Sequence, residues 1–241
     1  MITLYGWGPG FGCPSPSPYV MKSDMQLQML GVEFDRAIAD LESIPKGKAP
    51  YMKDEDLLIE DSNFIRAHME KKLGKNLDDG LSDAEIGTGW ALERMVESNL
   101  YSCILYERWL IPENFKKGPA TFFMGIPEDA RAQVIEEVLT QIKTSYWGTG
   151  FGRHSREERL KFAEWDILAI AAALGEKDYL FCDAPKAGDA SVASMLIAGA
   201  TPYFDTPVEE LITRHENLVA YMERVKSRYF SEAKWPTPEM A

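Results

Sequence analysis

Three short segments near the N-terminus combine residue types that bind anions and peptides. They are segment 17–22, which reads Ser-Pro-Tyr-Val-Met-Lys, segment 48–50, which reads Lys-Ala-Pro, and segment 61–62, which reads Asp-Ser. Serine followed by proline is a common helix start, because serine caps the first turn and proline has no amide to leave unbonded. The free amides at such a start attract an anion, and the Ser17 hydroxyl can donate to it. This site would suit a thiolate, although a plain helix cap is the commoner use of Ser-Pro.

The other two segments would extend this site into a groove. A cis bond before Pro50 would turn the backbone of Ala49 outward, so that an extended peptide could pair with it; the alternative is a proline that only blocks pairing at a sheet edge. Asp61 and Ser62 precede a predicted helix, where they would bind the carboxylate and ammonium groups of one ligand, or simply cap the helix. Together the three segments predict a groove with a thiol end, a peptide-backbone middle and an amino-acid head.

The hydropathy pattern of residues 1–78 predicts a small α/β sandwich of thioredoxin type. Apolar residues alternate in the segments expected to be strands and recur every three or four residues in those expected to be helices. The expected elements are a strand over 2–7, a Gly- and Pro-rich loop over 8–16, a helix over 18–30, a strand over 32–38, a hairpin over 51–59 and a helix over 63–73. This order places segments 17–22 and 61–62 at helix starts and segment 48–50 before a strand.

From residue 82 onward the pattern predicts helices only. Residues 78–81 form a linker, and Ser82 with Glu85 and Ser155 with Glu158 form capping boxes, in which each side chain bonds the other residue's backbone amide. The expected helices cover 82–109, 127–144, 155–174, a segment from about 188, and 207–229.

The composition and net charge restrict the partners and the cellular location that we expect. The chain has 241 residues with a net charge of −12, so a nucleic-acid backbone would be repelled and we expect no nucleic-acid partner. The longest apolar run is too short for a bilayer span, and the first residues lack the pattern of a secretion signal, so we expect a cytoplasmic protein without a membrane partner. Three cysteines in no metal-ligand spacing lead us to expect neither a disulfide framework nor a metal site.

The combined features resemble the glutathione transferase superfamily. Segment 17–22 is similar to the Ser-Pro-Phe-x-x-Arg motif of its serine-type classes. Residues 150–158, Gly-Phe-Gly-Arg-His-Ser-Arg-Glu-Glu, and residues 217–224, Asn-Leu-Val-Ala-Tyr-Met-Glu-Arg, resemble the branch that contains failed-axon-connections proteins and metaxins. The resemblance covers nearly the whole chain. It implies a thioredoxin-like α/β domain over residues 1–78 and an all-α C-terminal domain of glutathione transferase type over residues 82–241.

The resemblance also implies a reaction and the residues that carry it. Ser17 would stabilise the thiolate of glutathione, the cosubstrate, for attack on a small apolar electrophile bound against the helical domain. Glutathione itself would be bound by Lys48, Ala49, Pro50, Asp61 and Ser62. The superfamily implies a homodimer.

Two alternatives follow from departures from the family pattern. The long loop before the first helix would let Cys13 reach the site, which would favour thiol exchange through a mixed disulfide instead of addition to electrophiles. The failed-axon-connections and metaxin branch also includes proteins without a demonstrated need for catalysis, so a non-catalytic adaptor is the second alternative. Seven aromatic residues of the helical half would either line a cleft for the electrophile or form interhelical core: Tyr101, Tyr106, Trp109, Phe122, Phe123, Tyr146 and Trp147.

Overall fold

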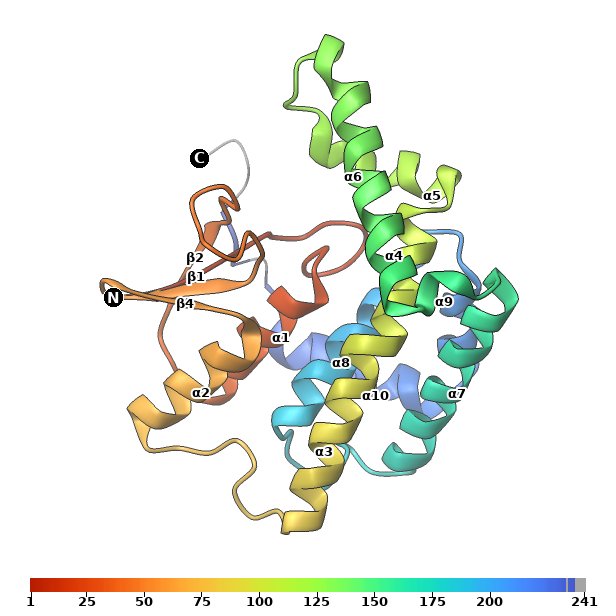
Figure 1. The fold of residues 1–241 in the computed structure, drawn as a ribbon. Helices are drawn as coiled ribbons and strands as arrows, with labels where there is room; N and C mark the ends of the chain where they lie inside the picture. The colour runs from red at the N-terminus through yellow and green to blue at the C-terminus, as the bar shows by residue number, and fades with distance from the viewer. Residues whose placement is uncertain (233, 237–241) are drawn as a thin grey trace.

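The N-terminal half of the chain is built on a mixed sheet of four strands (Figure 1). The computed structural model describes residues 1–232 and 234–236. The strands are β1 (Ile2–Gly6), β2 (Asp35–Ile38), β3 (Tyr51–Asp54) and β4 (Leu57–Glu60), in the order β2-β1-β3-β4. β1 runs parallel to β2 and antiparallel to β3, and a parallel pair needs a crossover connection. Helix α1 (Pro18–Met29) is that crossover.

Helix α1 lies between two hydrophobic cores. Its C-terminal part, with Leu27, packs with the sheet and with α2 (Ser62–Leu73) in one core. Its N-terminal part, with Met21 and Met25, belongs to the core of the helical half. Nine of its twelve residues are buried, which explains why its sequence has no single apolar face. Because α1 contributes to both cores, Ser17 at its start is held against both halves of the protein.

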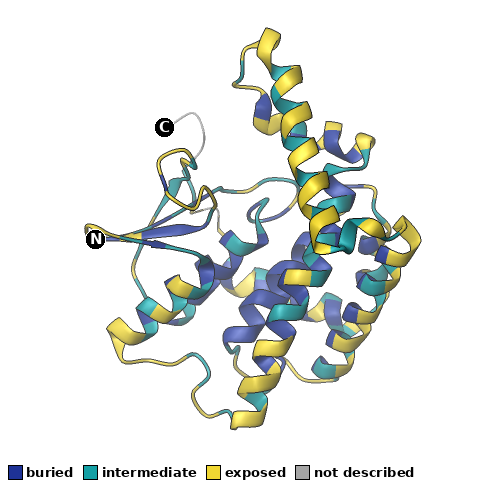
Figure 2. Ribbon diagram, viewed as in Figure 1, coloured by how far each residue is buried: buried dark blue, intermediate teal, exposed yellow. Residues whose placement is uncertain are grey.

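The C-terminal half is helical. Its elements are α3 (Asp83–Met95), the π-helical turn η1 (Val96–Leu100), α4 (Tyr101–Trp109), α5 (Pro112–Lys117), the 3-10 turn η2 (Pro119–Phe123), α6 (Glu128–Thr149), the 3-10 turn η3 (Phe151–Arg153), α7 (Arg156–Leu174), α8 (Ala187–Gly199), α9 (Pro207–Thr213) and α10 (Glu216–Tyr229). All of α8 is buried, and it packs against α1, α3 and α10. In contrast, α6 has no buried residue and its N-terminal end projects from the body (Figure 2).

The fold class predicted from sequence is confirmed, and the differences are local. The strand expected from residue 32 begins at Asp35, because the Val32 amide donates to the Leu27 carbonyl over 3.0 Å and belongs to the end of α1. The helix expected over 207–229 is two helices, since His215 adopts an extended backbone between α9 and α10. The helix expected to end at residue 144 continues to Thr149, where Gly150, with φ of 90°, ends it. Both predicted capping boxes are present.

Candidate active site

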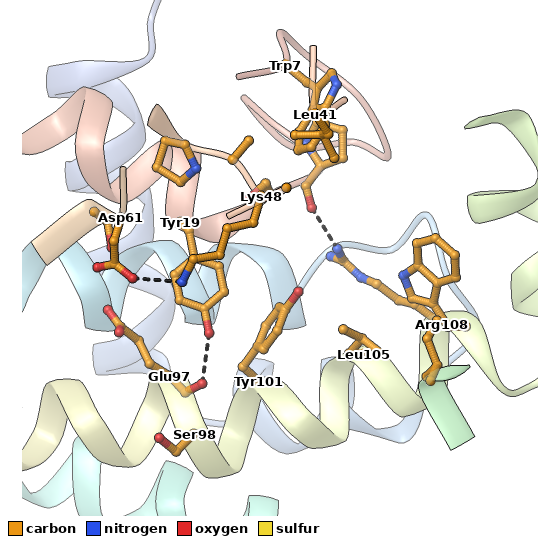
Figure 3. Close-up of a pocket in the computed structure, with 18 of the residues that line it drawn as sticks. Trp7, Tyr19, Leu41, Lys48, Asp61, Glu97, Ser98, Tyr101, Leu105 and Arg108 are labelled. Carbon is orange, nitrogen blue, oxygen red and sulfur yellow. Dashed lines mark hydrogen bonds and ion pairs between the residues drawn. The ribbon is translucent and has the colours of Figure 1, made fainter. Parts of the chain in front are cut away.

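A cavity of about 830 Å³ lies between the sheet half and the helical half (Figure 3). Its size is ordinary for a small-molecule site. Six of the residues singled out from the sequence line it: Ser17, Lys48, Ala49, Pro50, Asp61 and Ser62. The structure therefore brings the three N-terminal segments to one place. Helices α3 and α4 with the turn η1, together with η2 and α6, supply the opposite wall.

Ser17 is the N-cap of α1. Its Oγ accepts a hydrogen bond from the Val20 amide over 3.4 Å, and Pro18 occupies the first helical position. The Ser17 amide in turn donates to Ser15 Oγ over 3.2 Å, which fixes the approach of the loop. A helix start with these amides and its positive dipole end at a cavity wall is suited to bind an anion.

The peptide bond between Ala49 and Pro50 is cis, as expected. β3 begins at the next residue and is an inner strand, paired with β1 on one side and β4 on the other. Pro50 therefore does not block a sheet edge, which removes the alternative interpretation of this proline. Both residues line the cavity, so an extended peptide could lie along this backbone.

Asp61 caps α2 with an unusual backbone. Its φ of 90° is rare for a residue other than glycine, and such conformations are concentrated at functional sites. Its Oδ1 accepts from the Asn63 amide over 3.0 Å, while Oδ2 pairs with Lys48 Nζ at 2.9 Å. Burial raises the pKa of Asp61, but the hydrogen bonds from Lys48 and from the Asn63 amide outweigh it and hold that pKa below its usual value. Asp61 thus offers a carboxylate at the cavity wall.

A network of buried charges joins the two halves behind this wall. Lys22 is completely buried, and its Nζ donates to Asn63 Oδ1 over 2.7 Å, to Glu93 over 3.0 Å and to Glu97 over 2.7 Å. Burial lowers the pKa of Lys22 to about 8, against the opposing effect of Glu93. The Glu97 carbonyl accepts from the Tyr19 hydroxyl over 2.9 Å. Lys22 therefore ties the starts of α1 and α2 to the π-helical turn.

The far half of the cavity is mainly aromatic and apolar. It is lined by Trp7, Phe11, Tyr101, Leu105, Trp109, Phe122 and Ile142. Phe122 lies 6.1 Å from Trp109 between ring centroids and remains 49% exposed, so it is a wall of the cavity and not part of the core. Three of the seven aromatics considered from the sequence thus line the cavity. Of the other four, Phe123 is buried, Trp147 is 59% exposed, Tyr106 packs against the Arg159 guanidinium, and Tyr146 lines a separate hollow beside α7.

Four polar residues of the helical wall were not predicted from the sequence: Arg94, Glu97, Ser98 and Arg108. Together with Tyr101 and Leu105, they recur every three to four residues along α3, η1 and α4, which is also the spacing of a helix face that packs into a core. A charged residue on an otherwise apolar helix face was the signal that could have identified Arg108.

Cys13 lies apart from this cavity. It is only 5% exposed and belongs to the core of the helical half, where its thiol donates to the Ile197 carbonyl over 3.7 Å. Burial raises the pKa of Cys13, more than the nearby Arg108 lowers it. A thiol kept protonated and buried is a poor nucleophile. Among the residues that the structure describes, no three histidine, cysteine or acidic side chains are grouped as a metal site requires.

Comparison with known proteins identifies relatives along the whole chain. Residues 18–114 match a family model of the glutathione S-transferase N-terminal domain, and residues 163–225 match a model of the C-terminal domain. The isoprene-epoxide glutathione S-transferase of Rhodococcus sp. (strain AD45) is 32% identical over 240 residues, which cover 95% of this chain and 99% of that protein. Failed axon connections of Drosophila melanogaster is 25% identical over 96% of this chain and 59% of that protein.

Solved structures support the fold. The beta-etherase LigF of Sphingobium sp. strain SYK-6 superposes with a TM-score of 0.68 at 16% identity, over 94% of this chain and 95% of that one. A glutathione S-transferase from Methylobacillus flagellatus KT, solved with glutathione bound, superposes with a TM-score of 0.61 at 13% identity, over 98% of this chain and 100% of that one. At such low identity these structures show a shared fold.

The expectation of a cytoplasmic protein is wrong. The mitochondrial outer membrane import complex protein METAXIN of Arabidopsis thaliana is 25% identical over 100% of this chain and 76% of that protein. A relative named for a membrane complex contradicts the cytoplasmic assignment, which used only the absence of an apolar span and of a secretion signal. Within residues 1–232 and 234–236, no helix is long and apolar enough to cross a membrane.

Proposed function

The chain belongs to the glutathione S-transferase family, and we propose that it binds glutathione in the cavity and activates its thiol for attack on a small apolar electrophile. One observation carries this proposal. A single hollow is lined on one side by the starts of α1 and α2 and by the Ala49 backbone, and on the other side by aromatic rings. The first side matches a charged tripeptide and the second an apolar molecule.

Ser17 is the proposed thiolate partner. Its Oγ already accepts the Val20 amide, so the hydroxyl hydrogen is the group that can donate to sulfur. This bond and the positive end of α1 would stabilise the thiolate over the thiol and lower the thiol pKa, so that the nucleophile forms near neutral pH. The proton leaves to solvent, and the sulfur attacks the electrophile.

The remaining residues would orient the tripeptide. The Ala49 backbone would pair with the cysteinyl residue of glutathione. The Asp61 carboxylate would bind the ammonium of the γ-glutamyl head, and Ser62, with the amides at the start of α2, its carboxylate. Lys48 is 55% exposed at its side chain and lies at the rim, where it would bind the glycine carboxylate.

The experiment is Ser17→Ala, with Ser43→Ala as a control for removing a serine hydroxyl outside the cavity. We expect Ser17→Ala to lower kcat/KM for conjugation by a factor of about 10² to 10³, the usual cost of one donor to a reacting anion. The same change should raise the pKa of the bound glutathione thiol by about 1 to 2, as judged from the ultraviolet absorbance of the thiolate. Wild-type rates and thiol pKa in Ser17→Ala would exclude Ser17 as the activating group.

A second candidate is a binding protein without catalysis. The similarity to a metaxin and to Failed axon connections favours it. Calorimetry with reduced glutathione separates the two: a folded chain that gives no heat at millimolar ligand is not a glutathione-dependent transferase. The homodimer expected from the family stays a prediction, which light scattering in solution tests.

A further inference from the structure

Arg108 is a buried cation at the wall of the cavity. It is 5% exposed and lies on the face of α4 that also carries Tyr101 and Leu105, all three of which line the cavity (Figure 3). Its Nη1 donates to the Pro16 carbonyl over 3.1 Å, and its Nη2 donates to the Ala198 carbonyl. The two bonds fix the guanidinium beside the residue that precedes Ser17.

The protein supplies no negative charge for this cation within the described part of the chain. No carboxylate of those residues pairs with Arg108. The acidic groups that act on its charge are Cys13 and Tyr101, and burial raises the pKa of both, so they stay neutral near pH 7. Two carbonyls, the neutral Cys13 thiol and the Phe204 ring, 4.9 Å from the guanidinium carbon, solvate the charge only in part. A buried and unpaired charge is costly, and a ligand that brings a negative oxygen would remove that cost.

We propose that Arg108 stabilises the alkoxide that forms when the glutathione sulfur opens an epoxide, the class of electrophile in the name of the Rhodococcus relative. This inference rests on the proposed function. The glutathione sulfur attacks one epoxide carbon, the S–C bond forms, the C–O bond breaks, and its electron pair goes to the oxygen. That oxygen becomes an alkoxide three bonds from the sulfur and then takes a proton from solvent.

The positions of Ser17 and Arg108 match the places where negative charge starts and ends in this reaction. Negative charge starts on the sulfur beside Ser17 and ends on an oxygen a few ångströms away. Arg108 is attached through the Pro16 carbonyl to the same loop, on the side of the apolar half. A neutral epoxide enters an apolar pocket at little desolvation cost, and the positive charge acts only when the oxyanion develops. An interaction made only in the transition state raises kcat.

The test compares two electrophiles with the same hydrocarbon chain, epoxybutane and iodobutane. The epoxide leaves its charge on an oxygen, whereas the iodide releases a large and weakly bonding anion. The variants are Arg108→Gln and Arg108→Lys, and the control is Lys117→Gln, which removes one positive charge from the exposed surface of the neighbouring helix α5. Glutathione affinity and the pKa of the bound thiol are measured for each variant.

We expect Arg108→Gln to lower kcat/KM for epoxybutane by about 100-fold and that for iodobutane by less than about 3-fold. Arg108→Lys keeps the charge and should lose about 10-fold on the epoxide. Lys117→Gln should match the wild type on both. Should Arg108→Gln fail to fold, the ratio of kcat/KM for epoxybutane to kcat/KM for iodobutane is compared between Arg108→Lys and the wild type instead.

Three results would overturn the inference. An equal loss on both electrophiles means that Arg108 only holds the Pro16 loop, and no loss on either means that it has no part in the reaction. A wild-type chain that conjugates iodobutane but not epoxybutane excludes the epoxide. In each case a wild type that binds and ionises glutathione leaves the proposed function standing. A wild type that does neither overturns both proposals.

Discussion

Two cations are buried at the junction of the sheet half and the helical half, and their surroundings differ. Lys22 is enclosed by Glu93, Glu97 and the Asn63 side chain, all within 3.0 Å of its Nζ. Among the residues that the structure describes, Arg108 has two carbonyl oxygens, the Cys13 thiol and an aromatic ring beside it, and no carboxylate. A buried charge that the protein itself neutralises has a structural role, because removing either partner leaves the other charge buried and unpaired, which costs stability. A charge left without a counterion at a cavity wall is available to a ligand. The comparison therefore separates a cation with a structural role from the cation that we propose acts on a ligand.

The largest expected effect is on stability and follows from Lys22→Met. This change leaves Glu93 and Glu97 buried without their common partner, which should lower the free energy of unfolding by about 3 to 5 kcal/mol. Urea denaturation followed by tryptophan fluorescence measures it. Arg108→Gln should cost less stability than Lys22→Met, because it removes an unpaired charge along with its hydrogen bonds.

A double variant sharpens this prediction. Adding Glu93→Gln to Lys22→Met removes one of the two carboxylates that have lost Lys22 and should recover part of the loss. Arg94 stays within ion-pair distance of Glu97 in this background and limits the remaining cost. If Lys22→Met costs no more than Arg108→Gln, neutralisation by Glu93 and Glu97 does not distinguish the two sites.

The two sides of the cavity differ in how far they could be predicted from the sequence. Ser17, Ala49 and Asp61 could be identified because each stands at the start of a helix or strand, and element starts have local sequence signals. The helical wall has no such signal. The residues of this wall lie on one helix face, and their pattern is the same whether that face meets a core or a cavity. Only the packing of α6 and η2 decides between the two. The π-helical turn that places Glu97 was likewise invisible, since nothing in its composition differs from an ordinary helix.

The next effect concerns Asp166, a buried acid that has no ion-pair partner among the residues that the structure describes. Its carboxylate accepts a hydrogen bond from Asn99 Nδ2 over 2.7 Å, and burial raises its pKa to about 6 despite that bond. Unlike an arginine, a carboxylate can escape the cost of burial by taking a proton. Between about pH 4 and pH 6 the folded chain thus holds a proton that the unfolded chain has lost, so this group lowers stability as pH rises through that window.

Asp166→Asn should remove this pH dependence. The variant should gain about 1 to 2 kcal/mol over the wild type at pH 7 and little at pH 4. Urea midpoints at several pH values measure the difference, and Asp178→Asn, an exposed acid paired with Arg224, is the matched control. An Asp166→Asn gain that is equal at pH 4 and pH 7 would contradict the raised pKa and point to packing instead.

The smallest expected effect is on the exposed ion pair at the cavity rim, between Lys48 and Asp61. The side chains of Lys48 and Asp61 are 55% and 27% exposed, so solvent screens their attraction, and Lys48→Gln should cost less than about 1 kcal/mol of stability. Its effect on binding is more specific. If Lys48 holds the glycine carboxylate, Lys48→Gln should bind glutathione several-fold more weakly than the wild type. γ-Glutamylcysteine lacks the glycine, so the variant and the wild type should bind it equally tightly. Calorimetry with the two ligands measures this, and a similar loss for both would mean that Lys48 acts through Asp61 on the γ-glutamyl head. In that case Lys48 at the rim, like Lys22, would be neutralised by a carboxylate of the protein, whereas Arg108 at the wall would be neutralised by the ligand.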